Sequence, residues 1–155
     1  MLKDMFCTCL FGSRSTSNFK NNASSAESEW KDAIQFVPPI TEGEVIKVYD
    51  GDTITIVSKL PYDGSPLYRF SVRLAGIDCA EIKGKTEKEK VLAQEAKNAL
   101  QSLILHKVVA LKNLKTEKYG RILADVYIGE LHVNQWLLDK KYAVKYLGGT
   151  KSDWV

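Results

Sequence analysis

This 155-residue sequence has no long apolar run, only three cysteines and only two histidines. The longest uninterrupted apolar run is Val108 to Leu111, four residues, whereas a membrane-spanning helix needs about 20. The sequence therefore predicts no transmembrane helix. At the N-terminus, Lys3 and Asp4 are followed only by a short apolar patch that Thr8 interrupts, so we expect no secretory signal peptide.

The three cysteines, at positions 7, 9 and 79, cannot all pair within the chain, and the sequence has no CxxC motif and no Cys/His cluster. These absences argue against a disulfide framework and against a structural zinc site. A reducing, intracellular compartment is therefore favoured over secretion.

The composition is typical of one soluble globular domain, with 45% hydrophobic and 26% charged residues. The length allows one core and is too short for two ordinary domains. The net charge is +3, and the basic excess lies in residues 43–155, which carry 18 basic and 14 acidic residues. This excess permits a phosphate-bearing partner without requiring one.

The first 11 residues form an apolar patch that contains Cys7 and Cys9. Two interpretations stay open for this patch. It is either a lipid anchor, with S-acylation of Cys7 or Cys9 and peripheral membrane contact, or an unstructured tail.

Residues 12–40 are interpreted as a disordered linker followed by a docking segment. The first part is rich in Ser and Asn, a composition that cannot bury enough apolar surface to fold. Near its end, Trp30 and Phe36 are expected to dock onto the domain. A folded domain is predicted over 41–155.

Five short strands and two helices are expected in this domain, in the order β-β-β-α-β-β-α. Alternating and β-branched patterns predict the strands, and a T-x-x-E capping box at Thr86 begins the first helix. A helix between the third and fourth of five strands is typical of an OB-type barrel. The predicted fold class is therefore mainly β with helices (α+β), a five-stranded OB-fold barrel with two to three helices. The strands are expected over 43–49, 52–57, 68–74, 108–113 and 122–128, and the first helix should bury Leu92, Ala96, Ala99, Leu100 and Leu103.

Acidic and arginine residues fall at strand ends and in loops, where a barrel brings side chains together at its rim. Two aspartates offer oxygen ligands that suit calcium or magnesium, a glutamate can orient or deprotonate a water, and two guanidinium groups can hold phosphoryl oxygens. Each residue alone also fits a turn or surface role, and only the combination indicates metal-assisted phosphodiester hydrolysis. The five residues are Asp52, Arg73, Asp78, Glu81 and Arg121.

Four stretches between about Gly43 and Tyr146 resemble the staphylococcal nuclease (thermonuclease) family. They read KVYDGDTITI, RLAGIDCAEI, EKYGRILADVYI and VNQWLLDKKYA. The spacing matches as well, with five residues from Arg73 to Asp78 and three more to Glu81. The resemblance implies a calcium-dependent nuclease that hydrolyses DNA and RNA with little sequence preference and leaves 3′-phosphate ends.

The resemblance also implies the residues of a calcium site. Asp52 and Asp78 match the two aspartate ligands, and position 79 matches the residue whose backbone carbonyl completes the protein ligands. Asp50 matches an acidic residue in the outer shell of the metal. The sequence has Cys79 followed by Ala80 where the best-known member has Thr-Pro, so we expect weaker calcium binding than in the Thr-Pro members.

The catalytic roles are implied in the same way. Glu81 matches the glutamate assigned as general base, and Arg73 and Arg121 match the two arginines that stabilise the phosphoryl transition state. Lys118 and Tyr119 match residues beside the bound terminal phosphate.

The loop 82–90 carries four lysines, of which Lys83 and Lys85 are predicted to contact the substrate strand. The alternative for this loop is a solvated segment in which Glu87 and Glu89 balance the lysines.

Two other functions stay open. A barrel of this kind can be a non-catalytic OB-fold module that binds nucleic acid without cutting it, or a membrane-tethered adaptor that binds proteins. We expect a monomer in each case. After Tyr146 the sequence is too short for the long terminal helix of the best-known family member, and the segment 29–40 is the predicted replacement.

Overall fold

A computed structural model describes residues 33–84, 86–117 and 119–149. The apolar patch with Cys7 and Cys9, the linker up to residue 32 and the two lysines Lys85 and Lys118 lie outside the described residues. Residues Gln35–Val155 make up one compact unit, and the description below concerns its described part.

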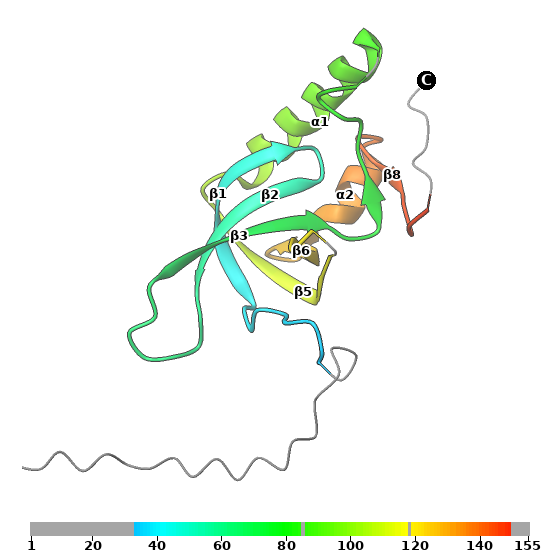
Figure 1. The fold of residues 1–155 in the computed structure, drawn as a ribbon. Coiled ribbons are helices and arrows are strands. Elements are labelled where there is room, and N and C mark those ends of the chain that lie inside the picture. The colour runs from blue at the N-terminus through cyan, green and yellow to red at the C-terminus, as the bar shows by residue number, and fades with distance from the viewer. Residues whose placement is uncertain (1–32, 85, 118, 150–155) are drawn as a thin grey trace, which may run out of the picture. The chain divides into compact units, whose positions relative to one another are not determined.

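Five strands close into a barrel, as the sequence predicts (Figure 1). Four antiparallel pairings join them in the order β3-β2-β1-β5-β6, and a parallel pairing between β3 and β6 closes the barrel. The predicted fold class, mainly β with helices and an OB-type barrel, is therefore confirmed. The strands are β1 (Glu42–Asp50), β2 (Thr53–Lys59), β3 (Leu67–Leu74), β5 (Val108–Thr116) and β6 (Ile122–Ile128).

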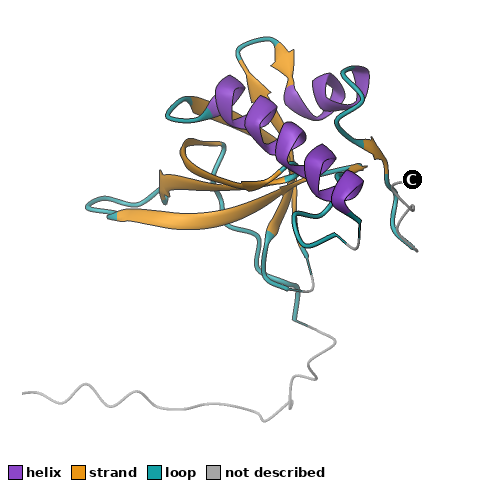
Figure 2. Ribbon diagram, turned by 90° about the horizontal axis from the view of Figure 1, so that it is seen from above, coloured by secondary structure: helices purple, strands orange, loops and turns teal. Residues whose placement is uncertain are grey.

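The helices α1 (Glu87–Ile104) and α2 (Val133–Asp139) complete the domain, and Figure 2 shows α1 lying across the barrel strands. The predicted cap is present, because the Thr86 hydroxyl accepts a hydrogen bond from the Glu89 N–H at 3.1 Å. Neither helix in the described part has the length and apolar composition needed to cross a bilayer.

The predicted buried face of α1 is wrong in part. Ala96 and Leu100 are buried as expected, but Ala93 and Ile104 complete the face, whereas Leu92, Ala99 and Leu103 are half-buried at its edges. Two alanines at the centre of the face let the helix approach the barrel closely, and the larger leucines then cover the margin of the interface.

Three very short strands were not predicted. The strand β4 (Ile77–Asp78) pairs antiparallel with β8 (Val144–Lys145), and β7 (Leu131–His132) extends the barrel sheet beside β6. The Tyr146 N–H donates to the Gly76 carbonyl at 2.9 Å beside the first pair. Backbone hydrogen bonds from residues 144–146 therefore fix the position of the segment that contains Asp78.

A buried asparagine on α2 fastens the same segment to the barrel. The Asn134 amide donates to the carbonyl oxygens of Ala75 at 2.9 Å and Ala124 at 3.3 Å, and its oxygen accepts from the Val126 N–H at 3.0 Å. A buried amide with its partners satisfied costs little and specifies one arrangement. Asn134 thus joins the turn after β3 to the adjacent strand β6.

The segment before β1 is attached at two points in its described part. The Ile40 side chain is buried in the core, and the Thr116 hydroxyl donates to the Phe36 carbonyl at 2.6 Å. The Phe36 ring is 69% exposed. Trp30, the other residue of the predicted docking segment, lies outside the described residues.

The turn between β1 and β2 is packed directly against α1 and residue 79. A Cβ atom at Gly51 would lie 2.9 Å from the Ala96 Cβ and 2.9 Å from both the Cβ and the Sγ of Cys79. These distances are shorter than van der Waals contact, so only glycine fits here. Because Asp50 and Asp52 flank this glycine, its close packing positions both carboxylates.

We expect Gly51→Ala to lower the free energy of unfolding by about 1–3 kcal/mol, because the added methyl overpacks a contact among buried atoms. Denaturant unfolding of the full chain measures this. Gly84→Ala is a control, since its Cβ would meet the Cγ, Cδ and Oε2 atoms of one flexible side chain, that of Glu89, instead of two buried residues. Equal stability of the two variants would contradict the packing argument.

Candidate active site

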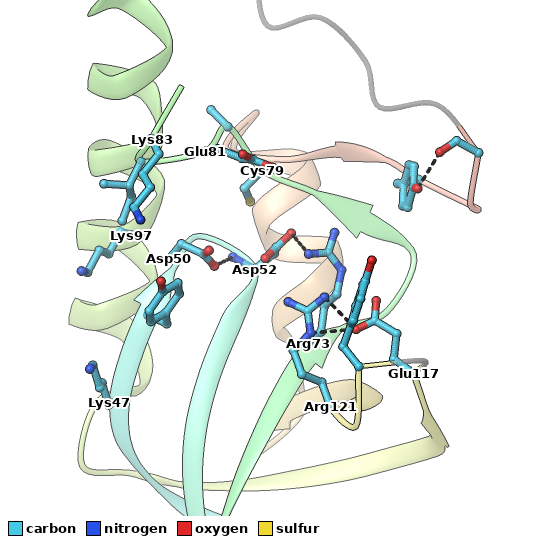
Figure 3. A pocket seen from close by; sticks show the side chains of 16 residues that line it. Lys47, Asp50, Asp52, Arg73, Cys79, Glu81, Lys83, Lys97, Glu117 and Arg121 are labelled. Carbon is cyan, nitrogen blue, oxygen red and sulfur yellow. Dashed lines mark hydrogen bonds and ion pairs between the residues drawn. The ribbon is translucent and has the colours of Figure 1, made fainter. Parts of the chain in front are cut away.

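A cleft of about 720 Å³ opens at the end of the barrel where β1 ends and β2 begins (Figure 3). Side chains of both charges line it, with five cationic and four acidic residues among the described ones. The cationic residues are Lys47, Arg73, Lys83, Lys97 and Arg121, and the acidic residues are Asp50, Asp52, Glu81 and Glu117.

Arg73, at the floor of this cleft, bridges Asp52, which also lines the cleft, and the buried Asp78 beneath it. Arg73 Nη1 lies 2.8 Å from Asp52 Oδ2, and Arg73 Nη2 lies 2.8 Å from Asp78 Oδ1. The Arg73 side chain is buried, so the alternative of a surface role, which the sequence left open for this residue, does not apply. The two ion pairs make this burial possible, because a guanidinium removed from water needs anionic partners.

The Asp52 carboxyl has an unusual protonation equilibrium in the absence of a bound cation. Burial raises its pKa from 3.8 to about 7, and the neighbouring Asp50 contributes in the same direction against the opposing effect of Arg73. Burial alone would lower the pKa of Arg73, but Asp52 and Asp78 reverse the effect, and the pKa of Arg73 is raised. The guanidinium therefore stays charged while Asp52 titrates near neutrality.

Cys79 directly follows Asp78, and its side chain is buried. Burial, with smaller contributions from Asp52 and Asp50, raises the pKa of this thiol well above its usual range. The protonated thiol packs against the Gly51 turn and is a poor ligand for a hard cation. Only the backbone carbonyl of this residue is therefore suited to a calcium site.

The wall of the cleft between β5 and β6 contains an ion pair that sequence reasoning missed. Arg121 donates from Nε and Nη2 to Glu117 Oε2, at 2.7 Å each. The i, i+4 spacing of the EKYGR turn was the available signal. Tyr119, at the tip of the same turn, is exposed and lines the cleft. Glu117 thus orients the arginine that was predicted to bind phosphate.

The opposite wall is formed by β1, α1 and the loop before α1 (Figure 3). Lys83 was predicted to contact the substrate strand, whereas no site role was predicted for Lys47 and Tyr49 on β1 or for Lys97 on α1. Strand and helix periodicity does not reveal which exposed residues of two separate elements face the same cleft.

The structure brings most of the predicted site residues together. Asp78 contacts the floor of the cleft through Arg73, and the remaining described residues line it, namely Asp50, Asp52, Arg73, Cys79, Glu81, Lys83, Tyr119 and Arg121. Their functional roles stay predictions.

The donor atoms suit a hard cation that keeps part of its shell free. Among the described residues, no three His, Cys, Asp or Glu side chains gather closely enough to hold a metal on their own. Asp52 and Asp78 supply carboxylate oxygens that lie 2.8 Å from the two terminal nitrogens of one guanidinium. Calcium takes six to eight oxygen ligands, including waters, so this oxygen donor set fits it with solvent or substrate completing the shell.

Comparison with known proteins gives one family. The family model described as staphylococcal nuclease homologue matches residues 71–153, more than half of the chain. A probable endonuclease of Schizosaccharomyces pombe is 28% identical over 145 residues, which cover 84% of this chain and 63% of that protein. The endonuclease Htp3 of Saprolegnia parasitica is 32% identical over 117 residues, covering 67% of this chain and 55% of the relative. Protein ParB of Escherichia coli is 31% identical over 86 residues, which cover 56% of this chain and 41% of that protein. The chain therefore spans less than two thirds of the length of these relatives.

The raised pKa of Asp52 predicts a pH-dependent gain in stability for Asp52→Asn in the presence of a metal chelator. An acid whose pKa is higher in the folded than in the unfolded state loses stability as the pH rises from its unfolded to its folded value, here from 3.8 to about 7. The variant lacks this loss, so its free energy of unfolding relative to the natural chain should grow by about 2–4 kcal/mol over that range.

Urea unfolding at several pH values between 4 and 8 measures this difference. Asp63→Asn, which removes an exposed carboxylate from the β2–β3 loop, is the control and should show far less growth. A difference for Asp52→Asn that does not change with pH would contradict the burial argument.

Proposed function

This chain belongs to the family of staphylococcal nuclease homologues, and on that premise we propose that it is a nuclease. It hydrolyses phosphodiester bonds of DNA and RNA with little sequence preference and leaves 3′-phosphate ends. The observation that carries this proposal is that Asp52, Arg73 and Arg121 line one open cleft, where Arg73 joins Asp52 to the buried Asp78. Such a cleft offers oxygen ligands to a cation and guanidinium groups to a phosphate.

Calcium is the proposed cofactor, with Asp52, Asp78 and the Cys79 carbonyl as its protein ligands and Asp50 in its outer shell. The floor of the cleft supports this, because one guanidinium faces two buried carboxylates and a divalent cation would offset the remaining negative charge. The bound ion would supply positive charge to the phosphoryl oxygens. Cys79 and Ala80 stand where the best-known family member has Thr-Pro, and we propose that calcium binds more weakly than in members with Thr-Pro as a result.

The arginines bind and stabilise the phosphoryl group in this proposal. Arg121 reaches the cleft from the turn before β6 and is held by Glu117, so a substrate phosphate would take the place of that carboxylate on the guanidinium. Arg73 is fixed at the floor by its two ion pairs. Donors that are oriented before substrate binds stabilise developing charge without reorganising during the reaction.

Glu81 is the proposed general base. It lies two residues after Cys79 and lines the cleft, from where it would take a proton from the attacking water. Attack on phosphorus breaks the bond to the 5′ oxygen, which leaves as a hydroxyl after gaining a proton, and the phosphate stays on the 3′ side. Lysine and arginine side chains that bind phosphate do not distinguish one base from another, so little sequence preference is expected.

Cleavage of single-stranded DNA, duplex DNA and RNA by the full chain, with calcium or with a chelator, tests this proposal. We expect calcium-dependent cleavage of all three, and Glu81→Gln should lower kcat by about 100-fold or more because proton transfer is lost. Glu130→Gln, an exposed glutamate in the β6–β7 turn, is the matched control and should leave kcat unchanged.

Binding of nucleic acid without cleavage would contradict the proposal. That outcome would instead support the alternative of a non-catalytic OB-fold nucleic-acid-binding module.

A further inference from the structure

The β1–α1 wall of the cleft contains an exposed tyrosine and two lysines that the proposed reaction does not use. Tyr49 is 57% exposed and lines the cleft together with Lys47 and Lys97. Figure 3 shows the two lysines on the side away from Arg121 and Glu117, with Asp52 and Arg73 between the two walls. A nucleic-acid strand bound between the two walls would lie beside Tyr49 and the two lysines.

A backbone irregularity directs Tyr49 toward this cleft. The pairing of β1 with β2 shifts register between Val48 and Asp50, so Tyr49 has no partner in the ladder, and a second shift lies between Val45 and Lys47. An extra residue of this kind bends the strand and redirects its side chain, and such bulges are frequent beside active sites. The bulge at Tyr49 directly precedes the carboxylates of the turn.

The chemistry of this wall suits an unpaired nucleotide. Lys47 Nζ lies 5.9 Å from the centroid of the Tyr49 ring, and Lys97 is half-buried on α1 along the same cleft. An aromatic face stacks a nucleic-acid base of any identity, and nearby ammonium groups hold the adjoining phosphate. Two other exposed tyrosines, Tyr62 and Tyr68, differ, because their hydroxyls bond to each other at 2.6 Å and neither lines the cleft.

We propose that Tyr49, Lys47 and Lys97 form a second nucleotide subsite, in which an unpaired base stacks on the tyrosine and its phosphate contacts the lysines. This inference rests on the proposed nuclease function and names the residues that would contact a nucleotide beside the cut bond. A base within a duplex is covered by its neighbours and cannot reach the ring without unstacking, which costs energy.

The test uses the full chain in a chelator, so that binding is measured without cleavage. The probes are a single-stranded DNA oligonucleotide that carries 2-aminopurine, whose fluorescence falls on stacking, and its duplex form. We expect Tyr49→Ala to weaken single-strand binding by about tenfold and to remove the fluorescence quenching. Duplex binding should change less than about twofold, since no base is stacked there.

Three variants make the result specific. Tyr49→Phe keeps the aromatic face and should bind like the natural chain, whereas Tyr49→Leu keeps only apolar bulk and should bind like Tyr49→Ala. Tyr62→Ala removes an exposed tyrosine outside the cleft and should change neither affinity nor quenching. Replacing Lys47 and Lys97 together with alanine should reduce the slope of log affinity against log salt by about 1 to 2, since two phosphate contacts are lost.

The outcomes separate this inference from the proposed function. Unchanged single-strand affinity in Tyr49→Ala, or no binding by the natural chain, overturns the subsite even if calcium-dependent cleavage is observed. Loss of affinity and quenching in Tyr49→Ala and Tyr49→Leu supports it, and it does so even in a chain that fails to cleave, in which case only the nuclease proposal fails.

Discussion

The two ion pairs of Arg73 are the interaction on which the cleft depends. Asp52 and Asp78 come from different parts of the chain, the β1–β2 turn and β4, and both are buried at the end of the barrel. Two carboxylates so placed would repel each other and lose their hydration. Arg73 lies 2.8 Å from each of them and offsets part of this cost, so one guanidinium joins three elements into a single acidic floor.

Several neutral contacts hold these three elements in place. Gly51 lets the turn pack against Ala96 and Cys79, the pairing of β4 with β8 fixes Asp78, and Asn134 ties the turn after β3 to β6. None of these contacts involves the charged groups themselves. In the proposed mechanism a cation would replace the guanidinium beside the carboxylates and a phosphate would replace Glu117 on Arg121, while the backbone that positions these groups would stay fixed, as a preorganised site requires.

Sequence patterns predict the barrel well because its strands and helices have clear periodicity and turn signals. The Thr86 cap lies where expected. The resemblance to the nuclease family located seven of the residues that line the cleft, namely Asp50, Asp52, Arg73, Cys79, Glu81, Tyr119 and Arg121. The two-residue strands β4, β7 and β8 were missed because a pairing that short leaves no periodicity. The burial of Arg73 and the position of Tyr49 were missed since the first depends on how distant segments meet in space and the second on a bulge. The Glu117–Arg121 pair is local, and its i, i+4 spacing was overlooked.

Calorimetric titration of the full chain with calcium tests the central claim most directly, since the proposed chemistry requires the acidic floor to accept a cation. We predict one site in the natural chain, affinity reduced at least about tenfold in Asp52→Asn and in Asp78→Asn because a charged ligand is lost, and no change in the exposed control Asp63→Asn. Absence of binding, or equal binding by all four chains, would contradict the account of Asp52, Arg73 and Asp78 as the centre of a cation-dependent nuclease.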